Sequence, residues 1–320
     1  MRSFLFCLIF AAAPVFADPL PSWNDTENKD RIIGFVDDVT DPSLDTFVPV
    51  SHRIAVFDND GTLWSEQPIY FQFLYAMDRA ADLDPATLTT PALKAAAAGD
   101  LAGVGAEGED GLLEVVGATH SGMSVDDFQA DVTCWLDTAT HPETGLSYDA
   151  MTYQPMVELL RYLRDEGFTT YIVSGGGIHF MRAFTEDAYG IPPRQIIGSL
   201  AKTELSDGAD GPEIVKAPDL VFLDDKEGKP IAIDRIIGTR PLMAVGNSDG
   251  DFAMIDWTTS GEGPRLGVLV HHTDAEREYA YDRDSHVGRL VQGLDEGPGK
   301  GWVIVDMAND WNRIWTGGTK

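Results

Sequence analysis

A short apolar run that ends in two acidic residues constrains the fold of this chain more than any other stretch. The run from Ile54 to Phe57 is followed directly by Asp58-Asn59-Asp60-Gly61-Thr62. Four apolar residues bounded by turn residues are typical of a buried strand. Ligands of open α/β sheets bind at the carboxyl ends of the strands. We therefore predict that Asp58 and Asp60 lie at such an edge, where two carboxylates can share a cation and act on a phosphate.

Strand and helix patterns alternate along the chain from residue 154 onward. A helical pattern starts at Pro155 and stops at Gly167, and later helices are predicted at 177–188, 231–238 and 249–257. Strands are predicted at 168–173, 196–200, 220–223, 242–245, 266–270 and 302–305. Such alternation predicts an α/β fold with a doubly wound, Rossmann-like and mostly parallel sheet.

Residues 66–149 differ from this pattern and are predicted to form a helical cap domain inserted after the first strand. They are rich in Ala, Asp and Gly, and Ser124 with Asp127 has the spacing of a capping box. The core would then comprise residues 51–65 and 150–320, preceded by an N-terminal segment, 18–50. The Gly-x-Gly-x-x-Gly pattern at 103–108 lacks the preceding strand of a dinucleotide site, so we interpret it as a flexible loop. The glycine-rich stretch 293–301 is interpreted as a surface loop.

The first 17 residues have the pattern of a secretory signal peptide. Arg2 precedes an apolar stretch, 4–13, and Ala17 ends a small-residue cleavage site. We therefore predict export, to the periplasm if the cell is Gram-negative. No later apolar run approaches the length of a membrane span. Cleavage would leave Cys134 as the sole cysteine, which excludes an internal disulfide framework.

The charge balance argues against polyanionic partners. The chain has 52 acidic and 23 basic residues, for a formal net charge of -29. Nucleic acids and anionic membranes would be repelled by such a protein. A small anionic substrate would need a local positive site made by a metal, a lysine or main-chain N–H groups.

Three further segments carry residues that suit phosphate chemistry. Ser174 and Gly175 follow a predicted strand, and a hydroxyl with N–H groups at such a turn binds anions. Lys229 precedes Pro230 at a predicted helix start and can offset negative charge. Its competitors for this role are Lys202, Lys216 and Lys226. The turn from Asn247 to Asp251 follows another strand and offers the oxygen ligands that Mg²⁺ requires.

The four segments, in this order, resemble the motifs of the haloacid dehalogenase-like superfamily, and the Ser-Gly-Gly form is similar to its phosphoserine phosphatase branch. The resemblance implies Asp58 as nucleophile, Asp60 as general acid/base and Lys229 as the third catalytic residue. It also implies Mg²⁺ at Asp58, Asp60, Asn247 and Asp251, although Asn247 stands where the family usually has Asp. Ser174, Gly175 and Glu66 would contact the substrate, Glu66 by analogy with a glutamate that recognises a substrate ammonium.

The predicted function is hydrolysis of a small phosphomonoester by an exported, Mg²⁺-dependent phosphatase through an aspartyl-phosphate. A 2-haloacid dehalogenase of the same fold is an alternative, but dehalogenation needs no leaving-group acid at Asp60. A non-catalytic relative that binds divalent cations is a second alternative, suggested by Asn247 and by the acidity of the chain.

Overall fold

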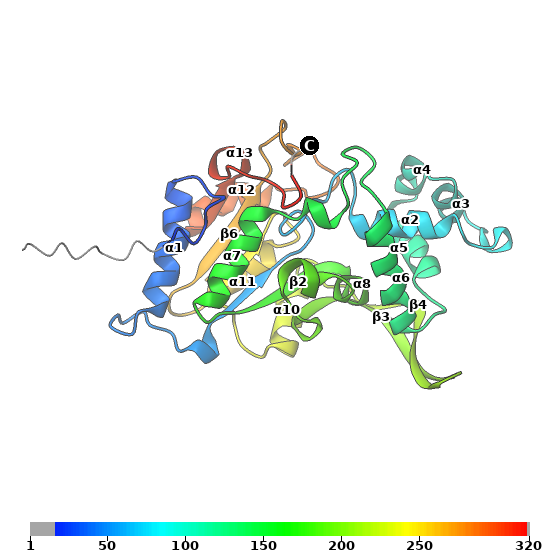
Figure 1. Ribbon diagram of the computed structural model, residues 1–320, viewed down its shortest axis with the longest axis horizontal. Coiled ribbons are helices and arrows are strands. Elements are labelled where there is room, and N and C mark those ends of the chain that lie inside the picture. The colour runs from blue at the N-terminus through cyan, green and yellow to red at the C-terminus, as the bar shows by residue number, and fades with distance from the viewer. Residues whose placement is uncertain (1–16, 319–320) are drawn as a thin grey trace, which may run out of the picture.

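One sheet forms the centre of the protein, for which the computed structural model describes residues 17–318. The expected signal peptide, 1–17, lies outside the described residues except for Ala17. In the described range, seven strands follow the order β4-β3-β2-β1-β5-β6-β7 (Figure 1). Their bounds are β1 Ile54–Phe57, β2 Thr169–Gly177, β3 Ile196–Gly208, β4 Gly211–Phe222, β5 Met243–Gly246, β6 Leu266–His271 and β7 Val303–Asp306. All neighbours are parallel except β3 and β4, which confirms the predicted α/β fold.

Strand β1 lies at the point where the chain changes direction across the sheet. It pairs with β2 on one side and with β5 on the other. Ligands of doubly wound folds bind outside the carboxyl ends of the strands at such a switch point. The fold therefore directs attention to the residues that follow β1.

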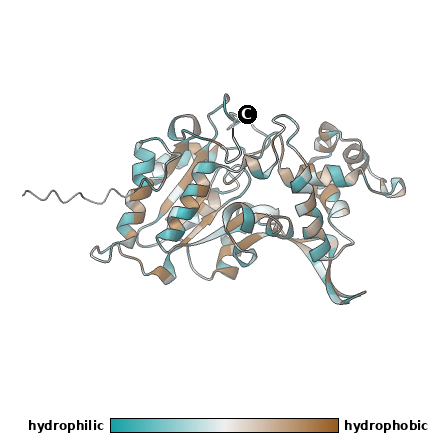
Figure 2. Cartoon of the chain, viewed as in Figure 1, coloured by the Kyte–Doolittle hydropathy of each residue, from teal (hydrophilic) through white to brown (hydrophobic). Residues whose placement is uncertain are grey.

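Separate apolar clusters cover the two faces of the sheet, and β1 contributes to both. Ala55 and Phe57 belong to one cluster, whereas Ile54 and Val56 belong to the other. This alternation follows from the two-residue period of a strand, and full burial of a valine or phenylalanine side chain contributes roughly 1.5–3 kcal/mol. Apolar strands accordingly lie between amphipathic helices (Figure 2).

The helices of the core divide between these two clusters. The cluster that includes Phe57 also contains residues of α1 Glu27–Thr40, α7 Gln154–Asp165, α8 Ile178–Arg182, α9 Thr185–Tyr189 and α13 Met307–Asp310. The other contains residues of α10 Gly228–Ile236, α11 Phe252–Thr259 and α12 Gln292–Glu296. Helix α7 ends before Gly167, which has a φ of +81° and so stops the helix as its sequence predicts.

Five helices follow β1 at one end of the molecule (Figure 1), and the first four pack around an apolar cluster of their own, whereas the fifth packs into the cluster that includes Phe57. They are α2 Phe71–Ala80, α3 Pro91–Ala97, α4 Leu101–Ala106, α5 Gly108–Thr119 and α6 Val125–Thr138. The start of α6 is capped by the Ser124 hydroxyl, which accepts a 3.0 Å hydrogen bond from the Asp127 N–H. We refer to these helices as the cap helices.

The prediction of a flexible loop at 103–108 is wrong. Helix α4 spans the first part of this stretch, and the Asp100 carboxylate caps it by accepting a 2.9 Å hydrogen bond from the Gly103 N–H. Gly108 begins α5 with a φ of +70°, a left-handed conformation that favours glycine. The glycines therefore mark a helix junction. Part of the predicted loop at 293–301 is helical as well, because α12 extends to Glu296.

The two short strands predicted at 196–200 and 220–223 are instead the bases of a long hairpin. Strands β3 and β4 pair as far as Gly208 and Gly211, and β4 reaches the cap helices. Val215 bridges to Ser124, and Gly117 of α5 lies against Pro218. The hairpin thus connects the sheet to α5 and to the start of α6. Across residues 17–318, the structure contains no helix with the length and apolar character needed to span a membrane.

Candidate active site

Polar residues near the carboxyl ends of β1, β2 and β5 meet at one edge of the sheet. The Asp58 N–H donates a 2.9 Å hydrogen bond to the Val245 carbonyl, which places Asp58 against the end of β5. Ser174 lies on β2, which is the other neighbour of β1. Asp58, Ser174 and Asn247 are all buried. Three strand ends that are distant in sequence therefore supply one polar cluster.

Lys229 joins the first of these residues to Asp251. Its ammonium nitrogen lies 2.7 Å from Asp58 Oδ1 and 2.6 Å from Asp251 Oδ1. Burial raises the pKa of Asp58, as does the Asp251 carboxylate, whereas the Lys229 ammonium opposes the rise. Burial alone would lower the pKa of Lys229, but the two carboxylates outweigh it and raise that pKa. Lys229 is therefore a cation fixed between two carboxylates.

Two of the three competing lysines contact other groups. Lys202 forms a 2.6 Å ion pair with Glu204 in the exposed part of the hairpin. Lys216 contacts His179 at 3.3 Å and the ring of Phe128. The structure thus brings Lys229, and neither of these two, to Asp58.

One carboxylate oxygen of Asp60 accepts a hydrogen bond, and the other lies beside the end of β2. Its Oδ1 accepts a 2.7 Å hydrogen bond from the indole N–H of Trp64, whose ring stacks on Phe184. A Cβ at Gly176 would lie 3.7 Å from Asp60 Oδ2 and 3.5 Å from Ser174 Oγ, so both atoms border that glycine. Burial raises the pKa of Asp60 to about 6. A carboxyl group of this acidity can give and take a proton near neutral pH.

The stretch after Ser174 continues as strand and does not enter a helix directly. Strand β2 runs through Gly177, and the predicted helix at 177–188 is divided into the short α8 and α9. The Gly176 N–H donates to Ser174 Oγ at 3.2 Å, and the Gly177 N–H donates to Gln72 Oε1 at 2.7 Å. These two donors already have protein partners. The Gly175 carbonyl accepts a hydrogen bond from Ser199.

The turn after β5 is closed by Asp251. Its Oδ2 accepts hydrogen bonds from the N–H groups of Asn247 at 2.9 Å and Ser248 at 3.1 Å. Because Oδ1 faces Lys229, both oxygens of Asp251 are engaged. Asp249 points away from this cluster, since its carboxylate accepts from the N–H groups of Val291 and Gly293.

Asn247 and Glu66 contact each other beside the two catalytic candidates. Asn247 Oδ1 accepts a 3.2 Å hydrogen bond from Thr62, and its Nδ2 donates a 2.6 Å hydrogen bond to Glu66 Oε1. The same Glu66 oxygen accepts a 2.8 Å hydrogen bond from the Tyr281 hydroxyl. Burial raises the pKa of Glu66 well above its usual range. The structure therefore places Glu66 against Asn247 and Tyr281, a pairing that the sequence does not reveal.

The oxygen atoms at this edge fit a hard cation such as Mg²⁺. Residues 17–318 contain no group of three or more acidic, histidine or cysteine side chains suited to hold a metal. Mg²⁺ commonly needs only one or two carboxylates and takes its other ligands from waters and substrate phosphates. No described residue donates to Asp58 Oδ2 or to the Asp60 carbonyl, and Thr62 alone donates to Asn247 Oδ1. These three oxygens could hold the ion, while Asp251 supports the site through Lys229.

A family model described as haloacid dehalogenase-like hydrolase matches residues 55–256. This span is more than half of the chain, and it includes Asp58, Asp60, Ser174, Lys229, Asn247 and Asp251. The chain belongs to the haloacid dehalogenase-like hydrolases. Members of this family are largely phosphatases, and those phosphatases generally use Mg²⁺. The predicted family is therefore confirmed.

Solved structures of other proteins are similar to this chain. A conserved protein of unknown function from Anaerococcus prevotii DSM 20548 is 18% identical with a TM-score of 0.53, and the match covers 81% of this chain and 89% of that one. A protein of unknown function from Bordetella pertussis Tohama I is 15% identical with a TM-score of 0.50, and the match covers 80% of this chain and 99% of that one. A phosphoserine phosphohydrolase-like protein from Francisella tularensis subsp. tularensis SCHU S4 is 17% identical with a TM-score of 0.40. That match covers 77% of this chain and 98% of that one. The comparison with curated proteins finds no match.

The segment that follows the family match, after residue 256, contacts the loop after β1 that carries Asp58 and Asp60. His272 Nε2 lies 2.8 Å from the Gly61 carbonyl. Glu278 Oε1 accepts hydrogen bonds from Ser65 and Tyr153, each at 2.9 Å. The sequence marks the pair at 271–272 only as adjacent histidines, and no local signal connects it to the loop after β1.

The cap helices of the hydrolase are connected to β2 through Gln72 and His120. Gln72 Oε1 accepts from Gly177, and Gln72 Nε2 lies 3.2 Å from His120 Nε2. Because the Thr119 hydroxyl donates to Val115, it can accept from His120 Nδ1 at 2.9 Å. His120 Nε2 is then the acceptor for the Gln72 amide, which requires a neutral imidazole. Burial, together with the nearby Lys216 ammonium, lowers the pKa of His120 to about 3.

This buried histidine is expected to make the hydrolase less stable as the pH falls. The unfolded chain binds a proton on His120 below pH of about 6.5, whereas the folded protein does so only near 3. Protons therefore favour unfolding between these two pH values. The free energy of unfolding falls by about 2 kcal/mol at pH 5 because of this residue. Urea unfolding of the wild type and of His120→Gln at pH 7 and pH 5 measures it. An equal pH dependence in both proteins would contradict the assignment.

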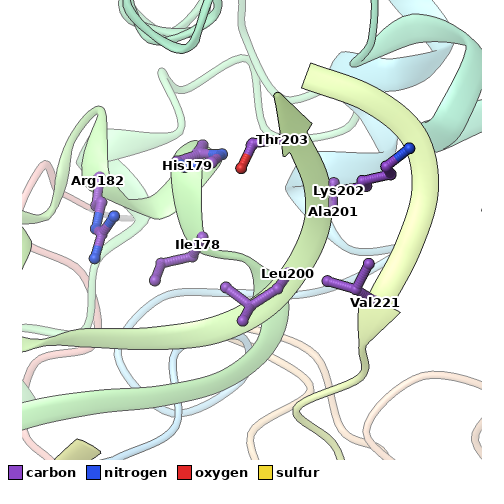
Figure 3. Close-up of a pocket in the computed structure, with 8 residues that line it drawn as sticks. All are labelled: Ile178, His179, Arg182, Leu200, Ala201, Lys202, Thr203 and Val221. Atoms are coloured by element: carbon purple, nitrogen blue, oxygen red, sulfur yellow. The ribbon is translucent and has the colours of Figure 1, made fainter. Parts of the chain in front are cut away.

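A cavity of about 450 Å³ lies apart from the candidate active site, between α8 and the hairpin. Its wall is formed by Ile178, His179, Arg182, residues 200–203 and Val221 (Figure 3). The His179 ring and the Thr203 hydroxyl point toward each other across it (Figure 3). Neither Asp58 nor Asp60 lines this cavity, so it is not where the catalytic candidates meet.

Proposed function

We propose that this protein is an exported, Mg²⁺-dependent phosphatase that hydrolyses a small phosphomonoester through an aspartyl-phosphate on Asp58. The observation that carries the proposal is the Lys229 ammonium between Asp58 and Asp251. It supplies a fixed positive charge beside a carboxylate in a chain whose formal net charge is -29. Without such a charge, a phosphate dianion would be repelled from the acidic strand ends.

The first half-reaction would use both acidic residues of the loop after β1. Asp58 Oδ1, which lies 2.7 Å from the Lys229 ammonium, would attack phosphorus, and Asp58 Oδ2 would remain to hold the cation. The bond from phosphorus to the leaving oxygen breaks, and the Asp60 carboxyl group transfers its proton to that oxygen. The products are a free alcohol and a phosphoryl group bonded to Asp58. A pKa of about 6 for Asp60 supports this role, because a useful fraction of the acid form exists near neutral pH.

The second half-reaction would return the enzyme to its starting state. A water molecule attacks phosphorus while the Asp60 carboxylate accepts its proton, and the bond from phosphorus to Asp58 breaks. Inorganic phosphate leaves, and Asp60 is again protonated. The Ser174 hydroxyl borders the same space as Asp60 Oδ2 and can donate to a phosphoryl oxygen in both steps.

Bound Mg²⁺ would neutralise negative charge on the phosphoryl oxygens. Asp58 Oδ2, the Asp60 carbonyl and Asn247 Oδ1 are the oxygens of this chain that would hold it. Asp251 would act through Lys229 and through the turn that presents Asn247.

Export forms part of the proposal because of the first 17 residues alone. A positively charged start, an apolar stretch and a small-residue cleavage site support secretion across the inner membrane. Expression of the full chain in a Gram-negative host, followed by N-terminal sequencing of the periplasmic fraction, tests it. A mature protein that begins at Asp18 is expected, and an uncleaved cytoplasmic protein would contradict it.

A screen of small phosphomonoesters tests the enzymatic part of the proposal. Phosphate release is expected with MgCl₂, and EDTA should reduce it by on the order of 10²-fold or more because charge neutralisation of the phosphate is lost. Added Mg²⁺ in excess should restore the rate, which excludes unfolding as the cause. Chloride release from 2-haloacids is measured in parallel. Halide release without phosphate release would contradict the proposal and favour a dehalogenase.

A further inference from the structure

Glu66 and Asn247 form a buried contact that neither the family match nor the proposed chemistry assigns. Their side chains are 2% and 1% exposed, and 2.6 Å separates Glu66 Oε1 from Asn247 Nδ2. The residues are 181 positions apart, so the contact connects the loop after β1 to the turn after β5. Gly61 lies between them, because a Cβ there would be 2.0 Å from Asn247 Nδ2 and 2.4 Å from Glu66 Oε1. The loop is therefore shaped around this pair.

The contact fixes which end of the Asn247 amide faces Glu66 and which end is left for other partners. An asparagine amide has a donor end and an acceptor end, and the surrounding hydrogen bonds decide its orientation. Glu66 Oε1 presents an acceptor and therefore faces the amide nitrogen. Thr62 donates to Oδ1 at 3.2 Å on the other side. An aspartate at this position would need no such selection, because both of its oxygens are acceptors.

Tyr281 holds Glu66 in this position. Its hydroxyl donates to Glu66 Oε1 at 2.8 Å, and its ring stacks on His272 with centroids 4.3 Å apart. His272 in turn contacts the Gly61 carbonyl at 2.8 Å. The C-terminal segment thus reaches both sides of the glycine that separates Glu66 from Asn247.

We propose that Glu66 and Tyr281 are positioning residues that direct Asn247 Oδ1 toward a cation beside Asp58. The inference rests on the proposed function, in which Asn247 contributes an oxygen to the Mg²⁺ site. Glu66 keeps the amide nitrogen, which would repel a cation, turned away from that site. This is how a chain with Asn at position 247 retains an oxygen ligand there.

A double-mutant cycle without Mg²⁺ tests the pairing itself. Asn247→Asp removes the amide that donates across the 2.6 Å contact and sets two acidic groups against each other, so the midpoint of urea unfolding should fall. Adding Glu66→Gln should recover at least half of that fall, because the glutamine amide can donate to the new carboxylate. The proposal is overturned if the unfolding midpoint of the double variant falls by as much as the falls of the two single variants added together. If Asn247→Asp is insoluble, recovery of folded protein in the double variant is the supporting result, and its failure is the overturning one.

Calorimetric titration with MgCl₂ tests the orientation of Asn247. Glu66→Ala should weaken Mg²⁺ affinity by about 10-fold or more, whereas Glu66→Gln, which keeps an acceptor, should remain close to the wild type. Tyr281→Phe should weaken affinity and Tyr279→Phe should not, since the Tyr279 hydroxyl donates to Glu143. Unchanged affinity in Glu66→Ala overturns the proposal. A wild type that binds no Mg²⁺ overturns the metal-dependent function as well, and the metal-free cycle separates the two failures.

Discussion

Asp58→Asn is expected to reduce phosphate release by on the order of 10⁵-fold, because an amide cannot replace a carboxylate as the attacking group. The substitution keeps the size of the side chain, and Asn Oδ1 can still accept from Lys229. Steady-state phosphate release measures the loss. In addition, rapid acid quenching with a phosphate-labelled substrate should trap label on the wild type and none on Asp58→Asn.

A buried aspartate far from the site provides the matched control. Asp310 is buried and accepts hydrogen bonds from Asn28 and from the Asp306 N–H. Asp310→Asn should keep turnover near the wild-type rate even though its stability falls. Asp58→Asn protein that is folded by circular dichroism and still turns over at the wild-type rate would exclude Asp58 as the nucleophile.

Both the fold class and the edge where the polar residues meet could be predicted from the sequence, because the signals are local. A short apolar run followed by Asp, Ser or Asn marks a strand and its carboxyl end together, as at Asp58, Ser174 and Asn247. Parallel strands direct these ends to one edge of the sheet, so the convergence follows from the fold. Lys229 could be preferred over the other lysines by its place at a helix start, and the structure brings it to Asp58.

The hairpin could not be predicted because its outer part lacks the pattern of a buried strand. Its exposed half, 202–207, is mostly polar, and Leu205 is 74% exposed. Pro212 and Pro218 lie within β4 and suppress a strand prediction. They are tolerated there because β4 is the edge strand of the sheet. Contacts with the cap helices, as between Val215 and Ser124, support the outer pairing, and such contacts have no local signal.

The partners of Glu66 were hidden from the sequence for a related reason. Tyr281 is 215 positions from Glu66, and His272 is 211 positions from Gly61. A buried glutamate needs hydrogen-bond donors, but the sequence does not show which residues supply them when they lie so far along the chain. The sequence therefore identifies the chemistry of the candidate site better than it identifies the residues that hold that chemistry in place.

Lys229→Met is expected to reduce both turnover and stability. Loss of the ammonium leaves Asp58 and Asp251 buried without their shared cation, and breaking a buried ion pair in this way typically costs about 3–5 kcal/mol. Turnover should fall by on the order of 10³-fold, because the positive charge that offsets the phosphoryl group is gone. Urea unfolding without Mg²⁺ and steady-state phosphate release measure the two losses.

Lys216 provides the control that separates charge pairing from side-chain packing. It is also a buried lysine, but no carboxylate in the described part of the chain lies within ion-pair distance of it. Lys216→Met therefore leaves no carboxylate unpaired and should destabilise the protein less than Lys229→Met. Adding Asp251→Asn to Lys229→Met should recover part of the stability, because it removes one of the two stranded charges and keeps an acceptor for the turn. Equal losses in the two lysine variants, with no recovery in the double variant, would show that Lys229 matters for its volume and not for its charge.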